Sequence, residues 1–283
     1  MSSVSASSTQ HGRHRASPVQ LVASGWRNRG LILQLTRRDI LGRYRGSILG
    51  LLWSLIYPML MLGVYTFVFS VVFHTRWPEA ANEGRTYFAI VLFAGMIVFG
   101  IFGECVQRSP SLIVSQPNFV KKVVFPLEIL PWVTLLAALF HACVSFSVLV
   151  ALELVAQHFV PWTIVALPFV LLPFAAMCLG LGWFLAALGV YIRDVGQIVG
   201  ICVTALMFLS PLFYPSSALP QKLAWIATFN PVAFPIEAVR DVLVFGRLPA
   251  LSAYLLSTAF DAVVLLAGFA WFQKTRRGFA DVI

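Results

Sequence analysis

An uncharged run of 26 residues, from Ile48 to Phe73, constrains this chain more than any other feature. A helix that spans a bilayer needs about 20 apolar residues, so the run is long enough to cross a membrane. Hydrophobic residues make up 59% of the 283 residues and charged residues only 11%, whereas a soluble domain normally carries about 25% charged residues. The chain is therefore predicted to be an all-α integral membrane protein.

Apolar runs predict six membrane-spanning helices in one transmembrane domain, residues 21–283. The predicted spans are 48–73, 86–107, 126–155, 162–191, 196–214 and 251–272. The apolar centre of the second span, Tyr87 to Phe102, has only 16 residues. It can extend if Glu104 and Arg108, four positions apart on one helix face, neutralise each other.

The distribution of basic residues predicts the topology. With the N-terminus inside, the cytoplasmic segments hold fifteen Lys and Arg residues and the external loops hold five. Cytoplasmic loops of membrane proteins collect Lys and Arg, so both termini are predicted to be cytoplasmic. The same rule accounts for the net charge of +9, and no nucleic-acid partner is needed to explain it.

The N-terminal region divides into a tail and a basic helix. Residues 1–20 are rich in serine and are predicted to be disordered. Residues 26–47 are predicted to form a helix in the membrane interface. Its apolar arc of about 100° contains Leu33, Ile40, Leu41, Tyr44 and Ile48. The arginines expected near lipid headgroups are Arg37, Arg38, Arg43 and Arg45, although Arg37 falls inside the arc; a solvated charged segment is the alternative.

Two predicted cytoplasmic loops are candidates for contact with a partner. Ser109-Pro110 is a helix-start signal and Pro117 a stop, so a two-turn helix is expected before Lys121 and Lys122. Such a helix can dock a partner, and an ordinary basic loop is an equally good interpretation. The second loop contains Arg193 and Asp194, for which local pairing is favoured.

The segment from Tyr214 to Ala250 is too apolar for a plain external loop. Asn230-Pro231 matches a helix start with a cap residue followed by proline. The stretch Leu219 to Phe229 is too short to span the membrane. We expect two short helices here that dip back and pack on protein, since lipid cannot satisfy an irregular backbone.

Chemical sites are sparse in this sequence. Ionisable residues inside the spans, such as His141 and Asp261, mark functional sites by default, but structural hydrogen bonding is favoured here, with Ser145 a partner for His141. No phosphate-binding loop motif is present, so any ATP must be bound by another chain. No catalytic, cofactor or metal site is predicted.

Several segments together resemble a known family. They are "LTRRDILGRYRGSILGLLWSLIYPMLMLGVYTFVFSVVF", "FAGMIVFGIFGE", "NFVKKVVFPLEILPW" and "SPLFYP…FNP". The chain from about Leu21 to Ile283 resembles the permease subunit of bacterial polysaccharide-export ABC transporters of the ABC-2 class. The resemblance is to the O-antigen (lipopolysaccharide) branch, with capsule and teichoic-acid exporters as near relatives.

This resemblance implies a homodimer in the bacterial inner membrane, two copies of a separate ATPase that hold ATP and Mg, and a lipid-linked polysaccharide as substrate. It implies an interface helix at 26–47, a coupling helix at 109–122 and re-entrant helices at 215–245. The expected ATPase-coupling residues are Ser109, Leu112, Ile113, Val114, Lys121, Lys122, Arg193 and Asp194. The expected glycan path contains Trp53, Tyr57, Phe69, Phe213 and Tyr214, and the expected outer gate contains Asn230, Pro231, Glu237 and Arg240.

Two other functions remain open at this point. A drug or other small-molecule exporter of the same class would share the fold and differ in channel width. A membrane-embedded acyl- or glycosyltransferase would need clustered polar groups at one membrane face, and His141 and Asp261 are isolated from each other in the sequence.

Overall fold

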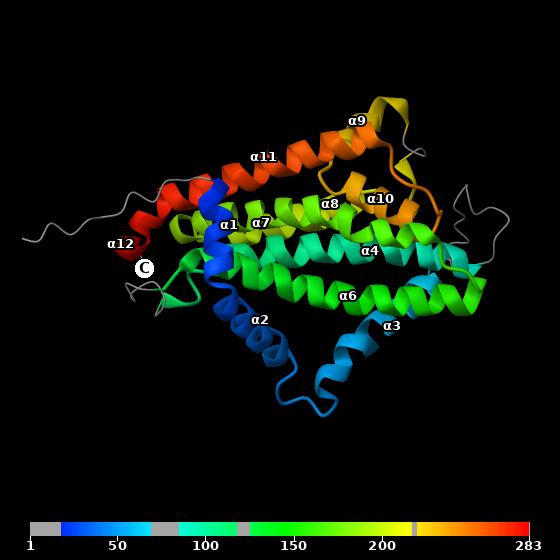
Figure 1. Ribbon diagram of the computed structural model, residues 1–283, viewed down its shortest axis with the longest axis horizontal. Coiled ribbons are helices and arrows are strands. Elements are labelled where there is room, and N and C mark those ends of the chain that lie inside the picture. Colours follow the sequence, from blue (N-terminus) through cyan, green and yellow to red (C-terminus); the bar gives the residue numbers. More distant parts are fainter. Residues whose placement is uncertain (1–17, 69–84, 118–124, 217–219, 283) are drawn as a thin grey trace, which may run out of the picture.

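The computed structural model describes residues 18–68, 85–117, 125–216 and 220–282, and all regular structure within these ranges is helical (Figure 1). The prediction of an all-α membrane protein is confirmed. The α-helices are α1 (Pro18–Arg27), α2 (Arg29–Arg43), α3 (Trp53–Tyr65), α4 (Arg85–Arg108), α6 (Leu130–Gln157), α7 (Leu167–Tyr191), α8 (Val195–Leu209), α9 (Ala224–Phe229), α10 (Ala233–Leu243), α11 (Leu251–Thr275) and α12 (Phe279–Val282).

Within the described ranges, five helical segments are long and apolar enough to cross a membrane. They are Gly50–Val68, Tyr87–Ser111, Leu127–Ala156, Trp162–Tyr191 and Leu251–Gly278. The predicted fifth span, 196–214, corresponds to α8, which has 15 residues and ends at Leu209. A helix of that length is shorter than a span usually needs, so the count of six spans stays a prediction.

The second span extends beyond its apolar centre as the sequence suggested. Arg108 and Glu104 form an ion pair at 3.2 Å near the end of α4. Pairing lowers the cost of placing both charges at the end of a spanning helix. The helical segment therefore continues to Ser111.

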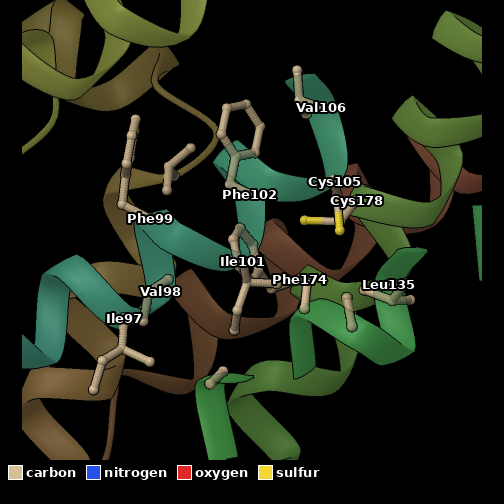
Figure 2. Close-up of a cluster of buried hydrophobic side chains, with 14 of the residues drawn as sticks. Ile97, Val98, Phe99, Ile101, Phe102, Cys105, Val106, Leu135, Phe174 and Cys178 are labelled. Atoms are coloured by element: carbon tan, nitrogen blue, oxygen red, sulfur yellow. The ribbon is translucent and has the colours of Figure 1, made fainter. Parts of the chain in front are cut away.

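The core is centred on α4, which packs against α6, α7, α8 and α10. Figure 2 shows Ile101 and Cys105 of α4 next to Phe174 and Cys178 of α7, with Leu135 of α6 in the same cluster. Because α4 is surrounded, its apolar residues are buried on most of its circumference. Helix α4 is therefore the central helix of the bundle.

Helices α7 and α11 approach each other most closely at two glycines. A Cβ atom added at Gly268 would overlap the carbonyl oxygen of Gly180, and one added at Gly180 would lie 2.5 Å from the carbonyl oxygen of Val264. Small residues at helix crossings let backbones touch in membranes, where van der Waals packing is a main source of association.

The N-terminal helical region differs from the prediction in its bounds. The predicted helix at 26–47 is two helices that meet at Asn28, and α2 ends at Arg43. Residues 18–20 belong to α1, so the predicted disordered tail at 1–20 is wrong there, and its remainder lies outside the described residues.

The buried face of α2 also differs from the predicted apolar arc. Ile32 and Leu35 pack against Ile129 and Val133 at the start of α6, whereas Leu33 of the predicted arc is exposed. The predicted arc is one apolar face of α2. A second apolar face lies beside it on the helix, and this second face packs against the rest of the protein. In Figure 1, α2 and α3 form a V that projects from the bundle.

Two short helices follow α8, as the sequence predicted. α10 packs on α4 and α7 and is buried along most of its length. Helix α10 begins at Ala233, and just before it the side-chain oxygen of Asn230 accepts a hydrogen bond from the Val232 amide at 2.9 Å. The expectation that both helices pack on protein is wrong for α9, whose Trp225 and Phe229 are exposed.

Candidate functional site

A cavity of about 470 Å³ lies between the end of α2, the helix α3 and the faces of α4 and α6. Its lining comes from α3, which is one arm of the V in Figure 1, and from α4 and α6 in the bundle. Its volume falls within the range of small-molecule sites. The lining residues are Arg43, Tyr44, Trp53, Ser54, Tyr57, Pro58, Met61, Tyr65, Phe93, Met96, Ile97, Gly100, Ile101, Glu104, Ala138, His141, Ala142 and Ser145.

The cavity exists because α3 is held to the bundle along only part of its length. Within the described residues, Leu62 and Pro58 of α3 are buried, while Tyr57 exposes 61% of its surface. On the opposite wall, Gly100 of α4 has no side chain to fill the space. The result is a hollow with an aromatic wall on α3 and an apolar wall on α4.

Polar groups gather at one end of the cavity. The indole N–H of Trp53 donates to the Ser47 hydroxyl at 2.8 Å. The Tyr44 hydroxyl lies 3.3 Å from Nδ1 of His141, and the two rings meet edge to face. The Ser145 hydroxyl donates to the backbone carbonyl of His141, so the expectation that it satisfies the imidazole is wrong.

A network of four charges joins α2 to α4 beside this polar end. Arg43 of α2 pairs with Glu104 of α4 and, at 3.4 Å, with Asp39 of its own helix. Arg108 donates to both carboxylate oxygens of Asp39, at 2.7 and 2.9 Å. The network has two positive and two negative groups, so it adds no net charge to the cavity.

Asp39 is ionised within this network. Burial raises the pKa of its carboxyl group, but the hydrogen bonds and positive charges of Arg108 and Arg43 outweigh burial and lower the pKa below its ordinary value of 3.8. The ionised carboxylate is therefore the form that holds α2 on α4 at neutral pH.

The predicted glycan-path residues do not come together. Trp53 and Tyr57 line the cavity. Phe213 and Tyr214 lie after α8, where the Tyr214 hydroxyl donates to the carbonyl of Phe208 at 3.2 Å. Phe69 lies outside the described residues. The cavity is also lined by Tyr44, Tyr65 and Glu104, which were not predicted to belong to the glycan path. They come together through tertiary contacts between α2, α3 and α4, which the sequence does not reveal.

Within the described residues up to 117, the predicted coupling helix at 109–122 is reduced to a short turn. Ser109–Ser111 forms one 3-10 turn that continues directly from α4, and turns follow to Ser115. Leu112 and Ile113 are buried in the protein's own core and Ser109 is 1% exposed, so the expectation that they face a partner is wrong for these three residues. Val114 is 40% exposed. Lys121 and Lys122 lie outside the described residues.

The structure does bring the two predicted inner loops together. Gly189, near the end of α7, sits so close to Pro110 that an added Cβ would overlap its carbonyl oxygen, and Gly196 of α8 also lies against Pro110. Arg193 and Asp194 are exposed in the turn between these glycines. Neither makes an ion pair in the part of the chain that the structure describes, so the favoured local pairing is wrong.

The predicted outer gate contains a buried structural arginine. Arg240 is 1% exposed and donates to the backbone carbonyls of Val91, Pro211 and Leu212. Arg240 is therefore held inside the protein, and its role in an outer gate stays a prediction. Asn230 is also buried and donates to the Ser210 hydroxyl at 2.9 Å, while Pro231 and Glu237 are half-buried.

Two acidic side chains are buried away from the cavity. Glu153 of α6 is 0% exposed and Asp261 of α11 is 2% exposed. Among the described residues, neither carboxylate oxygen of Glu153 has a hydrogen-bond partner, and Oδ1 of Asp261 also has none. The expectation of structural hydrogen bonding is wrong for that oxygen of Asp261.

The fold and the cavity define a multi-pass helical membrane protein with a hollow beside its first span. Comparison with known families narrows this class: the profile of the ABC-2 type transporter family matches residues 30–244, and the chain belongs to that family. Members of this family are transport subunits, as predicted.

Known relatives align with this chain over nearly its whole length. The O-antigen export system permease protein RfbA of Myxococcus xanthus is 28% identical over 267 residues, which cover 94% of this chain and 100% of the relative. The protein of the same name from Klebsiella pneumoniae is 25% identical over 256 residues, 89% of this chain and 95% of the relative. The predicted resemblance to O-antigen permeases is thereby confirmed.

Proposed function

We propose that this chain is the transmembrane subunit of an ATP-driven exporter that moves a lipid-linked polysaccharide across the bacterial inner membrane. The observation that carries the proposal is the similarity, from end to end, to permeases named for O-antigen export. A separate ATPase supplies the energy, with ATP and Mg bound in that chain. Both termini are cytoplasmic, following the distribution of basic residues.

The chemistry of the cavity supports a carbohydrate ligand. Sugars present flat apolar faces with hydroxyl groups at the edges. Trp53, Tyr57 and Tyr65 offer aromatic surfaces, and Tyr44 and Ser145 offer hydroxyl groups. The charged side chains beside the cavity, two positive and two negative, pair with one another. A site without net charge suits a neutral polar ligand better than a strongly charged one.

A homodimer is supported by one face of α8. Gln197, Gly200, Thr204 and Phe208 line a hollow there together with Gln107 of α4. Polar side chains of an apolar helix inside a membrane normally face protein or a water-filled path rather than lipid. A second copy of this chain against α8 would supply such surroundings.

The Pro110 turn is the proposed point at which the ATPase acts. It sits between the end of α7 and the start of α8, in contact with both. A push on Val114, Arg193 or Asp194 from a partner would therefore reach two helices through packed backbone. Tightly packed contacts of this kind transmit displacement because they have little free volume.

The experiment is deletion of the gene followed by complementation. Loss of surface polysaccharide, with lipid-linked glycan collecting inside the cell, is the expected result of deletion, and the chain should co-purify with an ATPase. Normal surface glycan in the deletion strain, together with increased sensitivity to a small hydrophobic drug, would favour a drug exporter of the same family.

A further inference from the structure

A second hollow, about 730 Å³, runs along α2 and shares no lining residue with the cavity beside α3. Its floor is apolar and includes Leu31, Leu35, Leu41 and Phe125. Its remaining lining residues are Gln34, Arg37, Arg38, Gly42 and Arg45. We call this hollow the α2 groove.

The four arginines in the C-terminal half of α2 and in the turn that follows it fall into two sets. Arg43 is engaged by Asp39 and Glu104. Arg37, Arg38 and Arg45 are exposed, and none of them makes a side-chain hydrogen bond or ion pair within the described residues. Among the described residues, no acidic side chain lines the α2 groove. The groove therefore presents three positive charges that no described side chain of its lining neutralises.

The depth of the groove follows from its neighbours. Phe125 lies two residues before Leu127, where a membrane-spanning segment begins. Helix α2 packs against Ile129 and Val133, in the first turns of that segment. The groove thus lies at the end of the spans, at the level of lipid headgroups.

Exposed apolar side chains surround the same arginines. Leu33 is 62% exposed, Leu41 is 47% exposed and Ile48 is fully exposed. Large apolar side chains placed among cations, at the end of a span, are typical of a segment lying in the bilayer interface. This pattern favours hydrocarbon chains over the surface of a soluble partner.

We propose that the α2 groove is a binding site for an anionic phospholipid of the bilayer. The phosphate group lies among Arg37, Arg38 and Arg45, because guanidinium groups match phosphate oxygens in geometry and charge. An acyl chain covers Leu41 and Phe125 on the apolar floor. The bound lipid fastens α2 to the membrane surface on the side that the protein core does not hold.

The test uses the purified full-length permease and measures its binding of phosphatidylglycerol and of phosphatidylcholine by native mass spectrometry. The test variant carries Arg38→Gln and Arg45→Gln together. Each basic residue near an anionic surface contributes about a fivefold factor, so the preference for phosphatidylglycerol should fall by up to about thirtyfold at low salt. The preference of the wild-type protein should also weaken as salt is raised.

Two matched variants keep the test independent of folding. Arg193→Gln with Arg277→Gln removes two exposed arginines outside the groove and should leave the preference unchanged. Arg38→Lys with Arg45→Lys keeps both charges and should retain most of the preference. All three should match the wild type in thermal stability in phosphatidylcholine.

Three results would overturn the proposal. The first is an equal loss of preference in the groove variant and in the Arg193/Arg277 control. The second is displacement of phosphatidylglycerol by a trace of isoprenyl pyrophosphate, which would make the groove a substrate site. The third is binding that appears only with an acidic partner protein and never with lipid. None of these measurements requires export, so the proposed function stands or fails separately.

Discussion

Arg108 and Asp39 are joined by two hydrogen bonds, of 2.7 and 2.9 Å, although 69 positions separate them in the sequence. Paired contacts of this kind fix orientation as well as distance. They attach α2 to the central helix α4, so a displacement of one is passed to the other.

Replacing Asp39 by Asn should loosen that attachment and lower stability by about 1 kcal/mol, since both partners are partly exposed. Thermal unfolding in detergent measures the change. Equal stability of Asp39→Asn and the wild type would contradict a holding role for this pair.

The same pair predicts a dependence on pH. The pKa of Asp39 is lower in the folded protein than its ordinary value of 3.8, so its contribution is fully present above that value and is lost as the pH falls through the lowered pKa. The stability difference between the wild type and Asp39→Asn should stay constant from about pH 8 to pH 5 and shrink below about pH 4. A difference that already shrinks near neutral pH would require another titrating group.

Replacing Gly268 by Ala should separate α11 from α7, because the added methyl group would overlap the Gly180 carbonyl oxygen. Overpacking of this kind costs about 1–3 kcal/mol or more. Gly63→Ala is the matched control, since nothing lies within 4 Å of its added Cβ. Thermal stability of the two variants in detergent should differ clearly, and similar values would disprove the close contact.

Replacing Arg240 by Leu should leave the carbonyls of Val91, Pro211 and Leu212 without their buried donor. Each unsatisfied buried group costs about 1–3 kcal/mol, so folded protein should be scarce in membranes. Arg247→Leu, at a more exposed site paired with Asp241, should accumulate normally. Immunodetection of membrane fractions compares the two.

Ile113 and Val114 are adjacent residues with opposite surroundings, 0% and 40% exposed. Ile113→Asp should destabilise the protein by several kcal/mol, because it buries an unpaired charge in the core. Val114→Asp should fold normally and lose stimulation of the partner ATPase. An ATPase assay on reconstituted complexes checks the second variant, and full stimulation would place the coupling contact elsewhere.

Tyr57→Ala should reduce export by about 3- to 10-fold while leaving folding intact, a factor that corresponds to about 0.7–1.4 kcal/mol of lost contact. Tyr57 lines the cavity beside α3, and the nearby Leu60, equally exposed, does not. Surface polysaccharide in strains carrying Tyr57→Ala or Leu60→Ala measures the difference. Equal export in the two strains would remove the cavity from the glycan path.

The long helices could be predicted from sequence because hydrophobicity over 20 residues is a property of local composition. The pairing of Glu104 with Arg108 was predictable for the same reason, since it depends only on helical spacing. The burial of Arg240 was not, because its three acceptors come from α4 and from the segment after α8. Nothing near Arg240 in the sequence reveals those partners.

The candidate site, too, could be predicted from the sequence only in part. The aromatic residues of α3 could be named from the sequence, whereas the opposing wall of α4 and α6 required the fold. The apolar face of α2 was misplaced because two apolar faces lie side by side on that helix. Only the position of Ile129 and Val133 decides which of the two faces is buried.

The glycine contact between α7 and α11 joins these two helices into one rigid unit. Backbones that touch cannot slide or tilt past each other without collision. Helix α3 is largely free of such contacts, since only 11% of the most apolar part of Gly50–Val68 is buried. In a conformational cycle we therefore expect α3 to move while α7 and α11 keep their relative position.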